Sequence, residues 1–429
     1  MLNEIKEKLK TRNLFITGGG GVGKSYYINQ LRKELGLELT SSTGVSAVNI
    51  GGQTLHSWAG IGIGDVPIHI QLEKIARNRT KIKELQLADY LVIDEVSMLD
   101  AYTLDYVDEV LREVRQSPEA FGGLRTILVG DFFQLPPVKL GQVVQRAGVD
   151  VMVDYCFTSS AWKELDPYVI HLTKVYRQAD SEFVQCLNNI RIGLPTEHDI
   201  ALLQARELKP WEQPPADTTR LFATNSYADR ENETHLNRLI GKEYTYEAVD
   251  NINAWLGNGF AMVSPDHPKL QPWDRQKYET FNKDCRVPRL LKLKIGARVM
   301  LLTNQYIHCG LGNGSCGYVT DLNERDVTVI FDNGVKIELE KETTEVRRGG
   351  RVSVSRLQFP LRLAYGLTVH RSQGLTLDRV LVEFDGTFAA GQIYVALSRV
   401  KSLDGLYIRN LTPDSIVADA RVLKFYGVK

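Results

Sequence analysis

The chain has 429 residues, of which 43% are hydrophobic and 24% charged, and its 52 basic side chains balance its 52 acidic ones. This length exceeds what one hydrophobic core holds and predicts two to four domains. The neutral balance does not point to a nucleic-acid partner, although a basic cleft can lie on a neutral protein. The five cysteines form no CxxC pair, which argues against a zinc or iron–sulfur site and against a secreted disulfide framework. No apolar run approaches the ~20 residues of a membrane span.

The first third of the chain alternates apolar strands with amphipathic helices. This βαβ rhythm predicts a parallel sheet covered by helices on both faces, in a first domain over residues 1–167. The expected strands are 13–17, 91–94 and 126–130, and the expected helices are 24–35 and 102–115. A glycine-rich and then basic segment at about 60–87 interrupts the rhythm, and we interpret it as a small insertion that projects from the sheet.

A second α/β domain is expected over residues 168–240 and 356–429, with strands near 169–172 and 221–224 and a helix over 228–239. Residues 241–355 differ in character, because they are rich in short strands. The strands expected there include 318–321, 327–331 and 335–339. Asn333-Gly334 joins the last two and is a strong hairpin signal. We therefore expect a small β-barrel inserted into the second α/β domain.

A glycine-rich loop carries the strongest chemical signal. Its residues Gly18, Gly20, Gly21, Val22, Gly23, Lys24 and Ser25 fit the pattern G-x-x-x-x-G-K-[ST]. In such loops backbone N–H groups surround the phosphates, the lysine reaches the β and γ phosphates, and the hydroxyl of the last residue binds Mg²⁺. A flexible glycine linker is the alternative, but the expected strand before the loop and helix after it favour a nucleotide site.

Two carboxylates follow the second buried strand, at Asp94 and Glu95. The carboxyl edge of a parallel sheet is where ligands bind in such folds. We expect Asp94 to hold Mg²⁺ and Glu95 to orient or deprotonate the attacking water. In isolation two acids at a strand end are commonly just solvated, but together with the phosphate loop they favour hydrolysis.

Gln134 lies in the sequence Gly130 to Pro137, after the third buried strand. A polar amide held by rigid prolines can sense whether a γ-phosphate is present, and we assign Gln134 that role. A glutamine before proline is also an ordinary loop feature, so the assignment depends on its place after a sheet strand.

The order of the motifs identifies a family. They span residues 18–25, 42–47, 51–57, 94–98, 104–115, 121–123, 130–138, 175–178, 311–317, 367–374 and 394–399. With these motifs, the sequence resembles the Pif-type (petite integration frequency) DNA helicases of helicase superfamily one, which are relatives of RecD. The resemblance covers almost the whole chain. It implies two tandem RecA-like domains, a wedge insertion in the first and an SH3-like β-barrel in the second.

The resemblance also implies roles that spacing alone would not assign. Arg177 and Arg399 become arginine fingers for the γ-phosphate, whereas an arginine chosen at random is most often a solvated surface residue. Gly374 joins the nucleotide site. The track for single-stranded DNA is implied for Thr43, His56, Asn225, Thr368 and His370. The basic stretch over residues 74–83 fits duplex DNA at a fork and a solvated helix face equally well.

The expected cofactors are ATP and Mg²⁺, and the expected partners are single-stranded DNA and DNA forks. The resemblance further implies 5′→3′ movement and one chain as the functional unit, in the cytoplasm or nucleoid of a bacterium or inside the host cell of a virus. Family members usually carry an adenine-reading glutamine upstream of the phosphate loop. None precedes Gly18, so we do not expect a strict preference for ATP. Two alternatives remain: a P-loop ATPase that moves or remodels without strand separation, and a DNA-binding module that uses nucleotide as a switch.

Overall fold

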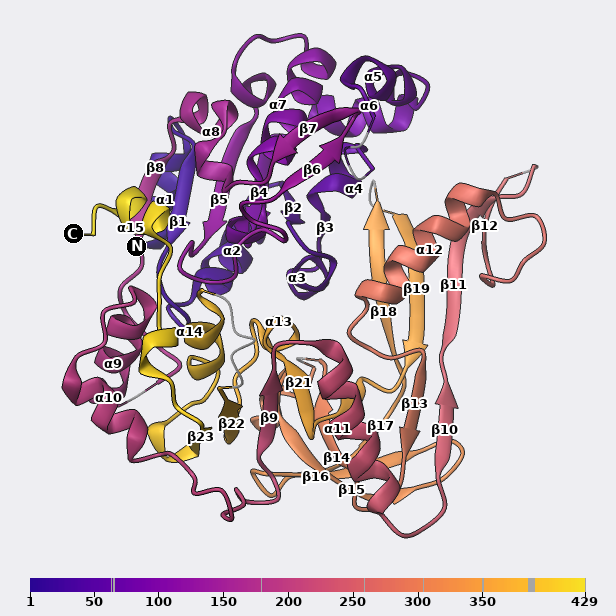
Figure 1. Cartoon of the computed structure of the whole chain (residues 1–429). Coiled ribbons are helices and arrows are strands. Elements are labelled where there is room, and N and C mark those ends of the chain that lie inside the picture. Colours follow the sequence, from indigo (N-terminus) through magenta and orange to yellow (C-terminus); the bar gives the residue numbers. More distant parts are fainter. Residues whose placement is uncertain are drawn as a thin grey trace. The chain divides into compact units, whose positions relative to one another are not determined.

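The structure is a computed structural model that describes residues 1–428 except 63, 65, 179, 258, 304, 349–350 and 385–389. Two compact units divide it: Met1–Tyr176 with Val346–Arg351, and Arg177–Glu345 with Val352–Lys429 (Figure 1). Each unit contains a parallel sheet, which confirms the predicted α/β class. Within the described ranges, no helix has both the length and the apolar character to cross a membrane.

The first unit is built on a six-stranded sheet in the order β3-β2-β4-β5-β1-β8, in which every pairing is parallel. The strands are β1 Leu14–Thr17, β2 Leu37–Ser41, β3 Gln53–Thr54, β4 Tyr90–Asp94, β5 Arg125–Gly130 and β8 Tyr168–His171. Strand β1 lies inside the sheet, between β5 and β8, so the loop that follows it starts within the carboxyl edge.

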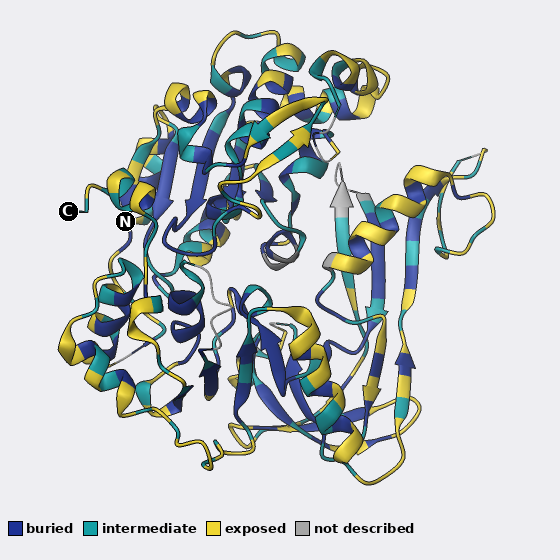
Figure 2. Ribbon diagram, in the orientation of Figure 1, coloured by how far each residue is buried: buried dark blue, intermediate teal, exposed yellow. Residues whose placement is uncertain are grey.

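Both faces of this sheet are covered, which explains the continuous apolar runs of its strands. On one face, Leu14 and Ile16 pack against the core side chains of the flanking helices. On the other face, Phe15 contacts Phe132 and Trp162, with ring centroids 5.4 and 5.1 Å apart. The central strands are accordingly drawn as buried in Figure 2.

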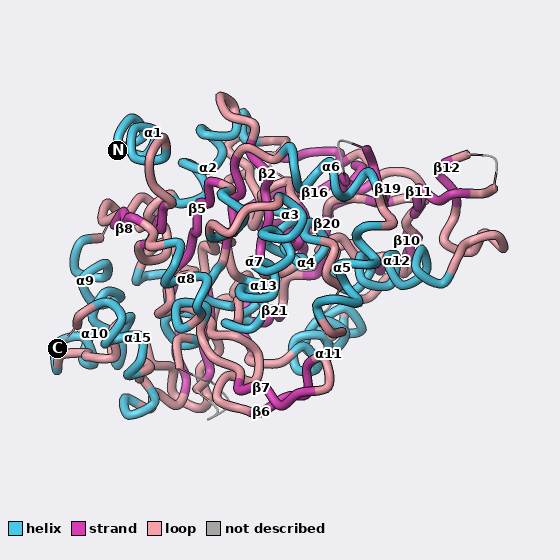
Figure 3. The backbone as a smooth tube through the Cα atoms, turned by 90° about the horizontal axis from the view of Figure 1, so that it is seen from above, coloured by secondary structure: helices cyan, strands magenta, loops and turns pink. Residues whose placement is uncertain are grey.

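Eight helices of the first unit are described around the sheet. They are α1 Leu2–Leu9, α2 Lys24–Arg32, α3 Gly44–Asn49, α4 Leu55–Ala59, α5 Ile68–Ala76, α6 Arg79–Leu87, α7 Ala101–Arg115 and α8 Ser160–Leu165. A separate antiparallel hairpin, β6 Val143–Arg146 and β7 Val149–Met152, completes the unit (Figure 3).

The segment predicted as an insertion contains α5 and α6, which pack against each other and against α7. Ile63, in its glycine-rich part, lies outside the described residues. Its basic side chains do not all face solvent: Lys81 is buried and donates from Nζ to the main-chain oxygen of Trp58 at 2.8 Å and to Glu84 at 2.6 Å. Lys74, Arg77, Arg79 and Lys83 are exposed.

The predicted start of the second domain at residue 168 is wrong for one strand. Strand β8 pairs in parallel with β1, with Leu14 opposite Tyr168 and Thr17 opposite His171, and so belongs to the first sheet. A short apolar strand carries no signal that tells which of two neighbouring parallel sheets it joins. The boundaries predicted at about 60–87 and at 240 stay predictions.

The second unit contains a four-stranded parallel sheet in the order β21-β9-β22-β23. Its strands are β9 Thr219–Phe222, β21 Gly366–Thr368, β22 Val380–Glu383 and β23 Leu406–Arg409. Its helices are α9 Ser181–Arg191, α10 Glu197–Gln204, α11 Asn225–Arg238, α13 Val369–Ser372, α14 Gln392–Leu397 and α15 Ala420–Tyr426.

Between α11 and β21 lies the predicted β-rich insertion. Its core element is a five-stranded sheet in the order β17-β16-β15-β14-β20, and a four-stranded sheet β12-β11-β19-β18 and a pair β10-β13 adjoin it. The elements are β10 Tyr244–Glu247, β11 Val249–Trp255, β12 Phe260–Val263, α12 Pro272–Asp284, β13 Leu290–Leu293, β14 Arg298–Leu301, β15 Cys316–Leu322, β16 Val327–Phe331, β17 Lys336–Leu339, β18 Glu342–Arg348, β19 Arg351–Gln358 and β20 Leu361–Leu363.

The predicted hairpin at Asn333-Gly334 is confirmed, since the turn joins β16 to β17 and Gly334 has a φ of 83°. The predicted return to the α/β pattern at residue 356 is wrong. Strand β19 continues to Gln358, and β20 pairs antiparallel with β14, so the parallel sheet resumes only at β21. Most residues between Gln358 and Gly366 are apolar, so the sequence carries no signal that shows where the chain passes from one sheet to the other.

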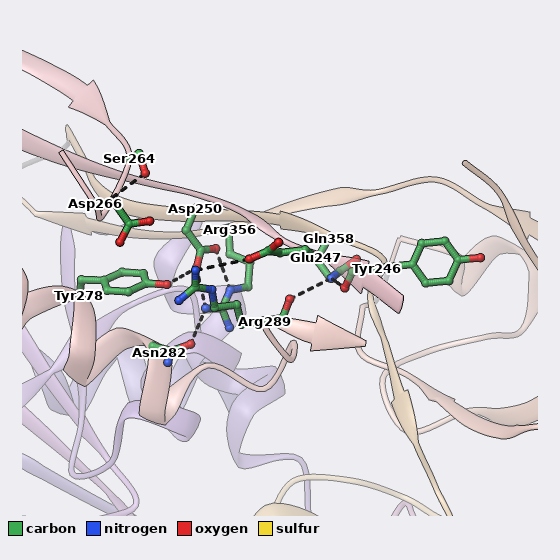
Figure 4. Close-up of polar contacts among 10 residues, drawn as sticks. All are labelled: Tyr246, Glu247, Asp250, Ser264, Asp266, Tyr278, Asn282, Arg289, Arg356 and Gln358. Carbon is green, nitrogen blue, oxygen red and sulfur yellow. Dashed lines mark hydrogen bonds and ion pairs between the residues drawn. The ribbon is translucent and has the colours of Figure 1, made fainter. Parts of the chain in front are cut away.

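A buried polar network fixes α12 to β11 and β19 (Figure 4). Arg356 donates to both carboxylate oxygens of Asp250, at 2.8 and 2.7 Å. Tyr278 donates from its hydroxyl to the same carboxylate at 2.6 Å, and Asn282 accepts from Arg356 at 2.6 Å. The Asp250 carboxylate and the Arg356 guanidinium thus each have several hydrogen-bond partners, as the two groups of a buried ion pair require.

Candidate functional site

The predicted phosphate loop leaves β1 and leads directly into α2. Gly18, Gly21 and Gly23 have φ angles of 147°, 79° and 86°, which residues with side chains rarely adopt. A Cβ on Gly18 would lie 2.3 Å from the main-chain oxygen of Leu172. The backbone path therefore requires the glycines, and the alternative of a flexible linker does not fit. Val22 is buried in the core of the unit.

Lys24 is the first residue of α2, and its ammonium points back into the loop. Its Nζ donates to the main-chain oxygens of Gly18 at 2.6 Å and Gly19 at 3.0 Å. Ser25 follows and is exposed. A positive charge and a hydroxyl thus lie at a helix N-terminus, where backbone N–H groups favour an anion such as a phosphate.

The two predicted carboxylates lie at the end of β4. Asp94 is 6% exposed, and its Oδ1 accepts from the main-chain N–H of Glu95 at 2.9 Å. Burial and the neighbouring charge of Glu95 raise the pKa of Asp94 to about 7, while the nearby ammonium of Lys24 lowers it. Lys24, Asp94 and Glu95 are therefore close enough to interact electrostatically, as the sequence predicts.

This arrangement fits Mg²⁺ bound together with a nucleotide. A buried carboxylate whose charge is disfavoured gains from a nearby cation. Ser25 and Asp94 supply hard oxygen ligands, the kind that Mg²⁺ prefers, and phosphate oxygens and water complete such a site. Among the described residues there is no cluster of three or more His, Cys, Asp or Glu side chains that would hold a metal without a substrate.

Gln134 lies in a turn directly after β5. It is 5% exposed, its N–H donates to the main-chain oxygen of Asp131 at 2.9 Å, and its side-chain amide reaches the Asp131 carboxylate at 3.4 Å. Strands β4, β5 and β1 are neighbours, with Ile93 opposite Leu128 and Thr17 opposite Gly130. The sheet thus places Gln134, the carboxylates and the phosphate loop along one edge.

Thr43 and His56 lie farther along the same edge. They each follow, by two residues, the paired positions Ser41 and Thr54 on β2 and β3. The Thr43 hydroxyl bonds to the Ser46 hydroxyl at 3.0 Å and accepts from the Ser46 N–H at 3.2 Å. His56 is partly buried, and burial lowers its pKa, which Asp100 opposes and Arg146 reinforces. The imidazole is thus favoured in its neutral form.

In the second unit, too, predicted DNA-contact residues lie at or just after the ends of two paired parallel strands. Thr368 at the end of β21 lies opposite Phe222 at the end of β9, and Asn225 begins α11 three residues later, exposed to solvent. His370 is half-buried, and burial lowers its pKa. Thr368 is 2% exposed, and its hydroxyl accepts from the Arg371 N–H at 3.2 Å. Its side chain caps α13 and so positions His370.

The two predicted arginine fingers share one neighbour in the second unit. Arg177 donates from Nε to the Thr376 hydroxyl at 3.0 Å and from Nη1 to the main-chain oxygen of Ser398 at 3.1 Å. Arg399 is 2% exposed, and its Nη2 donates to the Ser398 hydroxyl at 2.7 Å. Burial lowers the pKa of Arg177. Gly374 is exposed in the turn after α13, with a φ of 77°.

Two features of the site escaped the sequence analysis. Tyr176, next to the first arginine, donates its N–H to the main-chain oxygen of Gly21 at 2.9 Å and so braces the phosphate loop. At the end of β4, the hydroxyls of Thr40, Ser41 and Ser42 donate to the main-chain oxygens of Val92, Asp94 and Glu95. The signal was a run of three hydroxyl residues closing an apolar strand.

Known proteins share the sequence features of this architecture. A family model described as PIF1-like helicase matches residues 1–198, and one described as the 2B domain of DNA helicase Pif1 matches residues 278–322. The second match lies inside the β-rich insertion, where β13 to β15 are found.

Individual relatives match over nearly the whole chain. The human protein named ATP-dependent DNA helicase PIF1 is 37% identical over 99% of this chain, which spans 62% of the length of that relative. The ATP-dependent DNA helicase Pif1 of Bdellovibrio bacteriovorus is 32% identical, and 88% of its length is covered. The crystal structure of Pif1 helicase from Bacteroides in complex with ADP-AlF3 and ssDNA is 30% identical, covers 99% of this chain and 96% of its own, and has a TM-score of 0.65.

Proposed function

Because the chain belongs to the PIF1-like helicase family, we propose that it is an ATP-dependent DNA helicase that moves 5′→3′ along single-stranded DNA and unwinds duplex DNA. The observation that carries the proposal is the shared edge of the first sheet. Asp94 and Glu95 come at the end of β4, which pairs with β2, the strand that leads to Thr43, and β2 in turn pairs with β3, which leads to His56. Lys24 follows β1 at the same edge, on the far side of β5. A nucleotide site and a DNA contact on one edge can influence each other through a single strand pair.

In the proposed reaction, the loop N–H groups and Lys24 bind the phosphates of ATP. Glu95 orients the attacking water and accepts its proton, and Gln134 responds to the presence of the γ-phosphate. Ser25 and Asp94 would hold Mg²⁺, which when bound would neutralise part of the phosphate charge. The raised pKa of Asp94 supports a role beside a cation.

Arg177 and Arg399 act in the proposal as the cationic groups that stabilise charge on the γ-phosphate. Both are permanently charged forks, and their shared neighbour Ser398 supports a joint role. Loss of the γ-phosphate on hydrolysis would remove the charge that both arginines stabilise.

The DNA track in the proposal has one part on each unit. Thr43 and His56 contact the strand from the first unit, and Asn225 and His370 contact it from the second, with Thr368 as the residue that positions His370. Neutral imidazole, hydroxyl and amide groups suit backbone contacts that must be made and released at each step. Single-stranded DNA and forks are the proposed partners, and one chain is the proposed functional unit.

Strand displacement tests this function. Duplexes that carry either a 5′ or a 3′ single-stranded tail are incubated with the full chain, ATP and Mg²⁺, at an enzyme concentration varied across the tail concentration. We expect displacement from the 5′ tail only, proportional to the number of single chains bound. Hydrolysis stimulated by DNA without displacement from either tail would favour a translocase or remodelling ATPase, and displacement from the 3′ tail would overturn the polarity.

A further inference from the structure

Three consecutive hydroxyl side chains join the end of β2 to the end of β4. Thr40 donates to the main-chain oxygen of Val92 at 2.7 Å, and Ser41 donates to that of Asp94 at 3.1 Å. Ser42 donates to the main-chain oxygen of Glu95 at 2.7 Å. The first two bonds lie within the sheet, whereas the third reaches beyond the strand end to the proposed general base.

The Glu95 backbone needs such support. Its φ of 53° and ψ of 44° place it in the left-handed region, which is unfavourable for a residue with a side chain. Its main-chain oxygen accepts from the N–H of Met98 at 3.1 Å as well as from Ser42. The direction of the Glu95 side chain depends on this backbone conformation, so the Ser42 hydroxyl helps to set where the carboxylate points.

Ser42 is also attached to the proposed DNA contact. Its own N–H donates to the main-chain oxygen of Asp94 at 3.1 Å, and the next residue is Thr43, whose hydroxyl caps the start of α3. A shift of the Thr43 backbone is therefore passed through one peptide to Ser42, and from its hydroxyl to the Glu95 peptide. Among the side-chain hydrogen bonds described at this edge, this one connects the loop of Thr43 with Glu95.

We propose that Ser42 is a positioning residue that couples DNA at Thr43 to the placement of Glu95, and thereby sets how strongly DNA stimulates ATP hydrolysis. The inference rests on the proposed function, because it needs a DNA-stimulated ATPase. The coupling requires a side-chain hydroxyl donor at position 42. It does not depend on the size of that side chain or on how β2 and β4 pack.

The test is steady-state ATP hydrolysis by the full chain, with and without an oligo(dT) strand, in Ser42→Ala, Ser42→Thr and the wild-type protein. In Ser42→Ala we expect the ratio of DNA-stimulated to basal kcat to fall about five- to tenfold, the equivalent of one hydrogen bond, with the KM for ATP retained. Ser42→Thr keeps the hydroxyl and should restore the ratio.

Thr40→Val is the matched control, since it removes a hydroxyl bond between the same two strands at a distance from Glu95. It should retain the wild-type ratio. The proposal is overturned if Ser42→Ala keeps that ratio, if Thr40→Val loses it equally, or if Ser42→Thr does not restore it. A wild-type protein whose hydrolysis is indifferent to DNA would instead overturn the proposed function itself.

Discussion

Arg177 and Arg399 meet at a single residue, because Arg177 donates to the main-chain oxygen of Ser398 and Arg399 donates to the Ser398 hydroxyl. One comes from the segment after the first sheet and the other from the end of α14, far apart in sequence. Both guanidinium groups thus bind the same residue, and a shift of the Ser398 backbone affects both.

We therefore expect the two arginines to act as a pair in hydrolysis. Arg177→Ala and Arg399→Ala should each lower the kcat of ATP hydrolysis by roughly 10³-fold or more, because each removes charge stabilisation from the transition state. The double variant should lose little more than either single one, as groups that act together are not additive. Single-turnover hydrolysis measures the losses.

A surface arginine of the same unit provides the control. Arg379 forms an ion pair with Asp217 on the outside of the second unit, and Arg379→Ala should hydrolyse ATP at the wild-type rate. If the double variant shows the product of the two single losses, the arginines work independently and their shared contact with Ser398 has no catalytic consequence.

Lys24→Ala separates nucleotide chemistry from DNA binding. The ammonium binds the loop oxygens of Gly18 and Gly19, so its loss should abolish ATP hydrolysis and strand displacement. The proposed DNA contacts Thr43 and His56 follow other strands of the sheet, so the affinity for oligo(dT), measured by fluorescence anisotropy without nucleotide, should stay within about twofold, less than one neutral hydrogen bond. Displacement comparable to wild type would contradict the mechanism.

The nucleotide site was predictable because its chemistry lies in contiguous residues. The residues from Gly18 to Ser25 and the pair Asp94-Glu95 can be recognised from their types and from the apolar strands before them. The sheet then brings both segments to one edge. Tyr176 and Ser42 were not predictable, since Tyr176 acts through its main-chain N–H and the Ser42 hydroxyl binds a main-chain oxygen far away in sequence. Hydrogen bonds of that kind become visible only when the loop is folded.

The fold shows the same division. Strands β1, β4 and β5 were predicted within a residue or two from their apolar runs. The partners of β8 and β20 were not, because strands of three or four mostly apolar residues fit equally well beside a parallel or an antiparallel neighbour. Thr368 illustrates a further limit: the motif predicts a hydroxyl near DNA, and only the fold shows that this hydroxyl caps a helix.

The network around Asp250 should dominate the stability of the insertion. Asp250→Asn leaves the guanidinium of Arg356 buried without its counter-charge, and we expect a loss of about 3–5 kcal/mol in the free energy of unfolding. Tyr278→Phe removes one hydrogen bond to a charged group and should cost about 1.5–3 kcal/mol. Urea denaturation followed by tryptophan fluorescence reports both values. Equal losses in the two variants would contradict the expectation that the counter-charge of Arg356 matters more than the hydrogen bond from Tyr278.

Acid pH should weaken the protein through its partly buried histidines. Burial lowers the pKa of His370 below the ordinary value near 6.5, so the unfolded chain binds a proton more readily than the folded one. Stability therefore rises with pH in this range and is lost as pH falls through 6.5 toward the folded pKa, by at most about 1.4 kcal/mol per pH unit for one histidine. The free energy of unfolding measured at pH 7.5, 6.5 and 5.5 should decline accordingly.

His370→Gln tests whether this residue causes the decline. The amide does not titrate, so the variant should lose less stability than wild type between pH 7.5 and 5.5, whatever its stability at pH 7.5. His308→Gln, at an exposed position of the same unit, controls for the removal of a histidine and should leave the wild-type decline in place. An identical pH dependence in His370→Gln and wild type would mean that the imidazole is as easily protonated in the folded protein as in the unfolded chain, and that its place at the end of β21 does not favour the neutral form.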